Sequence, residues 1–218
     1  MMPSVAPMSN HERSPTPVDL NSGDRQLADF QFRVKNLMAI IRSIARRTVE
    51  NSLSLEDFGD HFDGRLLALS RSFRILARAG AFDLDFEELV REELLSHTAA
   101  ERAIVHGPSF RLSQNSAAAL GLAIHELAVN AVKYGALASA SGQLAVQWEL
   151  DEAGLRLEWR ESEVPAMDPK PRHRGFGREW IEQGLPYQLR AHTSLEFLPG
   201  GVVCIIRVPA DHIVGGAP

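Results

Sequence analysis

Cysteine is almost absent from this 218-residue sequence, whose single thiol belongs to Cys204. One thiol cannot form a disulfide within the chain, so packing alone must hold the fold together. Long apolar runs are missing as well. No apolar stretch approaches the roughly 20 residues that a membrane-spanning helix needs. The opening residues 1–17 also lack the apolar core of a secretory signal. These absences predict a cytoplasmic protein without membrane insertion.

A surplus of positive charge is missing too. The sequence has 23 Lys and Arg against 28 Asp and Glu, a formal net charge of −5. This balance argues against nucleic acid as a partner, because surfaces that bind phosphate backbones are usually basic. The 44% hydrophobic and 23% charged residues are ordinary for a globular protein, and the length allows one medium domain or two small ones.

Helical periodicity dominates the N-terminal part. Residues 1–23 carry few apolar side chains and are predicted to form a flexible arm. A second amphipathic helix is expected over residues 55–76, after a break at 51–54 in which Ser54 is a candidate N-cap. Before that break, apolar residues recur at alternating spacings of three and four, the seam of a coiled-coil-like helix. The seam positions are Leu27, Phe30, Val34, Leu37, Ile41, Ile44 and Thr48.

These helices form a predicted hairpin over residues 24–80 that cannot cover its own seam. Two copies would make a four-helix bundle, so the pattern predicts a homodimer. The alternative is that the hairpin packs on the C-terminal domain of its own chain.

Mixed patterns over residues 81–211 predict an α/β sandwich, followed by a tail at 212–218. The fold class is therefore α+β, a dimerisation hairpin followed by a sandwich domain. Helices are expected at 86–96, 115–134 and 177–189, short strands at 103–106 and 110–112, and hairpins at 143–150/155–161 and 193–198/202–208.

Three residues of the long predicted helix share one face: Glu126, Asn130 and Lys133, spaced four and three apart. A carboxylate, an amide and an ammonium can orient water, complete the shell of a magnesium ion and hold a phosphate. The alternative is a solvated polar stripe. Two glycines, Gly175 and Gly177, stand at the start of a later helix, where backbone N–H groups can meet a phosphate.

In this order, these blocks resemble the HWE subgroup of bacterial sensor histidine kinases, with HisKA_2-type dimerisation helices. His125 matches the subgroup's histidine, and Trp159 with Glu161 matches its Trp-x-Glu. The resemblance covers about residues 24–209. It implies a dimeric helical bundle followed by a Bergerat-type (GHKL) ATP-binding domain.

The resemblance also implies roles for individual residues. Asn130 would hold magnesium with Glu126 assisting beside it, and Lys133 would face the phosphates of ATP. Glu161 would read the adenine amino group. Gly175 and Gly177 would flank the ATP lid. The basic residues that are candidates to contribute to this lid are Lys170, Arg172, His173 and Arg174.

Two departures from the family pattern stand out. The family carries its phosphoacceptor in the string His-Arg-Val-Lys-Asn, but this sequence begins that string with Phe32, which has no nucleophilic atom. Phe32 is expected on the outward face of its helix, with Asn36 one turn later on the same face. The second departure replaces two glycines after Trp-x-Glu-x with Glu163 and Val164, which argues against binding of ATP and magnesium.

Three hypotheses follow. The leading one is a degenerate histidine kinase that docks a response-regulator receiver and dephosphorylates or sequesters it, with the Asn36 amide orienting the attacking water. The second is a non-catalytic dimeric scaffold. The third is a kinase that uses another acceptor, such as His61 on the second helix. An upstream sensor protein is a further candidate partner.

Overall fold

The computed structural model describes residues 20–79, 83–97, 100–164 and 175–214. The chain divides into two compact units, residues 1–35 and 36–218. The described part of the first unit is the N-terminal half of helix α1 (Leu20–Asn51). On this half, the seam residues Leu27, Phe30 and Val34 are exposed.

The predicted break between the first two helices is confirmed. Helix α1 ends at Asn51 and α2 (Leu55–Ala79) begins four residues later. The Ser54 hydroxyl accepts a hydrogen bond from the Asp57 amide (3.0 Å), and the Asp57 carboxylate accepts one from the Leu53 amide (3.0 Å). Each side chain thus accepts a hydrogen bond from a backbone amide at the start of the helix, a reciprocal arrangement like that of a capping box.

The second unit buries part of the hairpin seam within the same chain. Ile40, Ile44 and Leu69 belong to the hydrophobic core that also contains helix α4 (Gln114–Tyr134). Gly121 permits this close approach of α2 and α4, since a Cβ there would lie 2.7 Å from the Ser72 hydroxyl. The C-terminal half of α1 and helix α2 therefore pack on the sandwich domain of their own chain, which is the alternative to a seam buried by a second copy.

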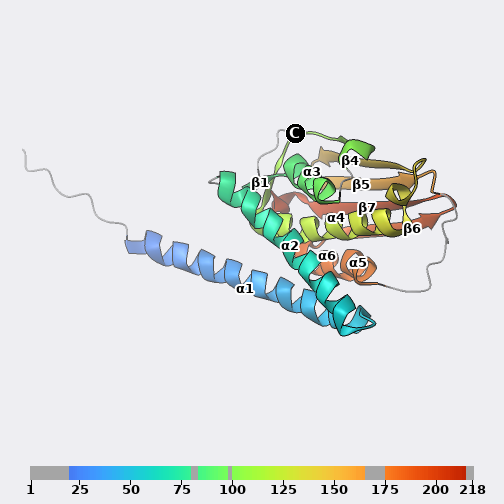
Figure 1. The fold of residues 1–218 in the computed structure, drawn as a ribbon. Helices are drawn as coiled ribbons and strands as arrows, with labels where there is room; N and C mark the ends of the chain where they lie inside the picture. The colour runs from blue at the N-terminus through green and yellow to red at the C-terminus, as the bar shows by residue number, and fades with distance from the viewer. Residues whose placement is uncertain (1–19, 80–82, 98–99, 165–174, 215–218) are drawn as a thin grey trace, which may run out of the picture. The chain divides into compact units, whose positions relative to one another are not determined.

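The sandwich has two sheets. The strands of the larger sheet are β2 (Ala103–His106), β4 (Gln143–Asp151), β5 (Gly154–Ser162), β6 (His192–Leu198) and β7 (Gly201–Pro209). Their order in the sheet is β2-β4-β5-β7-β6. Strands β2 and β4 are parallel, and the other neighbouring strands are antiparallel. Buried and exposed side chains alternate along β4, so one face of this sheet is covered. Helix α4 and α3 (Phe86–Ser96) lie over that face (Figure 1).

The smaller sheet was only partly predicted. Its order is β1-β3-β8, formed by β1 (Asp83–Asp85), β3 (Arg111–Ser113) and β8 (Ile213–Val214). Both pairings with β3 are antiparallel. The tail expected over 212–218 is thus wrong for its first residues, because Ile213 pairs with Leu112 in this sheet.

The last predicted helix is present but irregular. It consists of α5 (Phe176–Glu179), a π-helical turn (Trp180–Gly184) and α6 (Leu185–Leu189). The indole of Trp180 donates a hydrogen bond to the Ala119 carbonyl (3.1 Å), which ties this segment to α4. Among the described ranges, no helix is both long and apolar enough to cross a membrane.

Candidate functional site

A pocket of about 1020 Å³ opens between α2, α4, the end of β5 and the start of α5. The structure gathers there the residues that the sequence singled out in the C-terminal domain: Glu126, Asn130, Lys133, Glu161, Gly175 and Gly177. Phe32 and Asn36 lie on α1 and are not lining residues. Phe32 is exposed, as its place on the helix predicts, whereas Asn36 is half-buried rather than fully outward.

Glu161 is held firmly at the end of β5. One carboxylate oxygen accepts a hydrogen bond from the Ala136 amide (2.7 Å) and the other from the Trp159 indole (3.0 Å). Trp159 and Glu161 are two residues apart on a strand, so their side chains leave the same face. Burial raises the pKa of Glu161, and the two hydrogen bonds oppose this. The site thus presents an immobilised acceptor.

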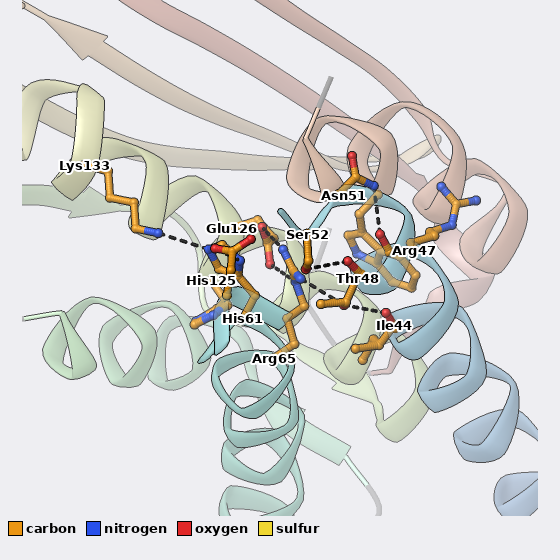
Figure 2. Close-up of polar contacts among 12 residues, drawn as sticks. Ile44, Arg47, Thr48, Asn51, Ser52, His61, Arg65, His125, Glu126 and Lys133 are labelled. Atoms are coloured by element: carbon orange, nitrogen blue, oxygen red, sulfur yellow. Dashed lines mark hydrogen bonds and ion pairs between the residues drawn. The ribbon is translucent and has the colours of Figure 1, made fainter. Parts of the chain in front are cut away.

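Glu126 has a different environment from the expected one beside a magnesium ion. Its two oxygens accept hydrogen bonds from Arg65 of α2, at 2.7 and 3.3 Å, and both side chains are more than nine-tenths buried (Figure 2). The same guanidinium donates to the Thr48 hydroxyl (2.9 Å) and lies 3.8 Å from the ring centre of Phe176. Arg65 therefore joins α1, α2, α4 and α5 at one point.

Lys133 extends toward α2 at the other end of the same helix face. Its ammonium lies 3.2 Å from Nε2 of His61 (Figure 2). On the other side of the ring, Nδ1 of His61 lies 3.2 Å from a carboxylate oxygen of Asp57. Arg65 meets Glu126 while His61 meets Lys133, so α2 and α4 run antiparallel along the pocket. Asn130 is exposed and lies between Glu126 and Lys133 on this face.

A second polar cluster surrounds His125 of α4. Arg71 donates to both oxygens of Glu93 (2.9 and 2.6 Å), and lies 3.2 Å from Nδ1 of His125, which is itself 3.2 Å from Nε2 of His97. Burial works to raise the pKa of Glu93, but the hydrogen bonds and charges of His125 and Arg71 outweigh it and lower that pKa. Glu93, His97 and His125 are close enough to share a metal ion, yet Arg71 already supplies the positive charge there.

The glycines differ in their surroundings. A Cβ on Gly177 would lie 2.9 Å from the Cβ of Glu126 and 3.4 Å from the Asn130 amide nitrogen, whereas one on Gly175 would meet nothing within 4 Å. Only glycine lets the backbone at 177 approach α4 this closely. The basic residues 170–174 lie outside the described residues.

Glu163 and Val164, which replace the two glycines of the family pattern, lie outside the pocket lining. The Glu163 carboxylate accepts a hydrogen bond from the Gln143 amide (3.1 Å), and Val164 is buried. The cost of the replacement is in the backbone instead, since Glu163 adopts φ 55°, a left-handed conformation that favours glycine.

Arg65 was missed in the sequence, although a signal existed. It stands three residues after Phe62 and four before Leu69, on the apolar face of the second helix. A charged side chain in such a seam is rarely buried without a partner. This spacing indicates a buried ion pair, but it does not identify Glu126 as the partner.

The sheet order and helical layer match the fold of solved histidine kinase structures. The blue-light activated histidine kinase of Erythrobacter litoralis EL346 superimposes with a TM-score of 0.60 at 21% identity, over 92% of this chain and 63% of that one. Its histidine kinase domain alone gives a TM-score of 0.54 at 15% identity, over 80% of this chain and 94% of that domain. At these identities the likeness shows the fold.

Comparisons of sequence identify the family more closely than the fold does. Residues 29–109 match the family model described as HWE histidine kinase. The blue-light-activated histidine kinases of Brucella anthropi and Brucella ovis are each 32% identical over 187 residues, covering 83% of this chain and 38% of the relative. The chain belongs to the HWE histidine kinase family, as the motifs predicted. It spans 38% of the length of these relatives.

Proposed function

We propose that the protein is a two-component signalling module that binds ATP with magnesium in the pocket, docks a phosphorylated receiver domain and promotes loss of its phosphoryl group. The observation that carries this proposal is Phe32. It is 61% exposed on α1, at the position where the resemblance expects the phosphoacceptor. A phenyl ring accepts no phosphoryl group, but its burial against a partner would contribute on the order of 2 kcal/mol.

The pocket residues fit ATP and magnesium. The Asn130 side chain is exposed and offers the hard oxygen that magnesium prefers, and Lys133 offers an ammonium for a phosphate. Each Glu161 oxygen keeps lone-pair capacity beyond its one accepted hydrogen bond, which suits an exocyclic amino group. Bound magnesium would neutralise phosphate charge. Glu126 is expected to keep Arg65 in place rather than to contact the ion.

Asn36 is the proposed phosphatase residue. It follows Phe32 by one helical turn, so a receiver seated on Phe32 would bring its phosphoaspartate near the Asn36 amide. An amide can orient a water molecule for attack without any covalent step.

A homodimer is part of the proposal. The exposed seam residues Leu27, Phe30 and Val34 form an apolar row on the first unit, and a second copy could cover that row. Ile44 is buried in its own chain, so we limit the proposed dimer contact to the N-terminal half of α1. An upstream sensor protein is the other candidate for this row.

The experiment follows the lifetime of phosphorylated receivers. Receiver domains from the same organism are phosphorylated with acetyl phosphate and mixed with the wild-type protein or with Asn36→Ala. We expect the wild type to shorten the lifetime of at least one receiver, and Asn36→Ala to restore it while docking is retained. Docking without any shortening would replace the phosphatase by a sequestering scaffold. Absence of docking to every receiver would refute the proposal.

A further inference from the structure

His61 is the one described histidine that contacts Lys133 in the pocket. Its partner Asp57 is positioned independently, because the other Asp57 oxygen accepts the Leu53 amide (3.0 Å). The remaining Asp57 oxygen lies 3.2 Å from Nδ1 of His61, and a carboxylate at this distance favours the tautomer with the proton on Nδ1. In the neutral ring, the lone pair is then on Nε2.

The Nε2 atom of His61 faces the ammonium of Lys133. The Lys133 ammonium, 3.2 Å away, is a donor without acceptor capacity, which favours the same tautomer as Asp57 does. The side chain of His61 is 33% exposed, so the ring is accessible to a ligand in the cavity. A basic nitrogen beside an ammonium is well placed for an incoming phosphoryl group, because the ammonium balances its negative charge.

The two other histidines that line the pocket have different partners. His125 is 6% exposed, and its Nδ1 lies against Arg71. Burial and the neighbouring His125 lower the pKa of His97, whose Nε2 faces that same Nδ1. Nδ1 of His125 also lies 3.5 Å from the Glu93 carboxylate, so this nitrogen belongs to the second polar cluster and not to the contact with Lys133.

We propose that His61 accepts the γ-phosphoryl group of ATP bound in this pocket. The inference rests on the nucleotide binding in the proposed function and is independent of Asn36. In the step, Nε2 donates its electron pair to the γ-phosphorus, and the bond from that phosphorus to the β,γ-bridging oxygen breaks. ADP leaves with the electron pair of the broken bond. The Nδ1 proton passes to the Asp57 carboxylate, and the product is Nε2-phosphohistidine.

The experiment incubates the full chain with magnesium and γ-labelled ATP, then locates the phosphoryl group by peptide mapping at neutral to alkaline pH. We expect acid-labile, base-stable label on the peptide that contains His61. His61→Gln should abolish the label, while the matched control His192→Gln, an exposed histidine at the start of β6, should keep it. Asp57→Asn should slow labelling by about 100-fold, the effect of losing a positioned proton acceptor.

Calorimetry with a non-hydrolysable ATP analogue distinguishes failure of phosphoryl transfer to His61 from failure of nucleotide binding. If the analogue binds but the wild type takes up no label, or takes it up elsewhere, the inference is overturned while nucleotide binding stands. If the analogue does not bind, the nucleotide part of the proposed function fails and the inference fails with it. Mapping is done on the wild type, so the result does not depend on folding of any variant.

Discussion

Replacing Arg65 by methionine should destabilise the protein more than any exposed substitution. Methionine keeps much of the aliphatic volume but leaves the Glu126 carboxylate charged, more than nine-tenths buried and unpaired. Breaking a buried ion pair in this way costs about 3 to 5 kcal/mol. Total stabilities are about 5 to 15 kcal/mol, so at least about a fifth of the free energy of unfolding would be lost.

The assay is urea unfolding followed by circular dichroism. The matched control is Arg46→Met, which removes an arginine whose side chain is 82% exposed and pairs with Glu50 four residues on. Exposed pairs of this kind contribute about 0.5 kcal/mol or less. In the double variant Arg65→Met with Glu126→Gln, neutralising the carboxylate should recover much of the loss.

Two results would refute this reasoning. One is a loss of less than about 1 kcal/mol for Arg65→Met with an unchanged dependence on urea. The other is strict additivity in the double variant, because contacting residues in one network should couple by about 0.5 to 3 kcal/mol.

Three further predictions concern other parts of the chain. Glu163→Gly should raise the free energy of unfolding by about 0.5 to 1 kcal/mol, because it relieves a φ of 55°; a lower melting temperature would contradict this. The lowered pKa of Glu93 stabilises the folded state above its ordinary value of 4.5, and this contribution is lost as the pH falls through the lower folded-state value; urea unfolding of Glu93→Gln should therefore show a weaker loss of stability on acidification. Phe30→Glu should turn a dimer into a monomer in light scattering without changing the circular dichroism signal, and a monomeric wild type at high concentration would rule out the dimer.

Much of the fold was predictable because local signals agreed with tertiary packing. The capping pair of Ser54 and Asp57 fixes the hairpin break, and the turn after Asp151 fixes the register of β4 and β5. The β8 strand was missed since Ile213 and Val214 are too short a run to signal a strand.

The apolar seam of the first helix shows what residue spacing can predict and what it cannot. Its spacing predicts that Val34 and Ile44 share a face, but not what covers them. The structure buries Ile44 against its own sandwich domain and leaves Val34 exposed. Long-range partners of this kind are set by tertiary packing, which spacing does not encode.

The candidate site was predictable where one helix or strand presents the residues, as for Asn130 and Lys133 on α4. The contributions of α2 were not, because Arg65 and His61 acquire their partners only when α2 packs along α4. Sequence reasoning placed His61 on the second helix, but its position in the pocket comes from the fold.

The most direct test of the account is a titration of the full chain with a non-hydrolysable ATP analogue and magnesium, with Asn130→Ala beside the wild type. The account predicts one analogue bound per chain, a dependence on magnesium, and at least a tenfold weaker affinity for the variant, equivalent to about 1.4 kcal/mol. Absence of binding by the wild type at millimolar analogue, or equal affinity of both proteins, would contradict it.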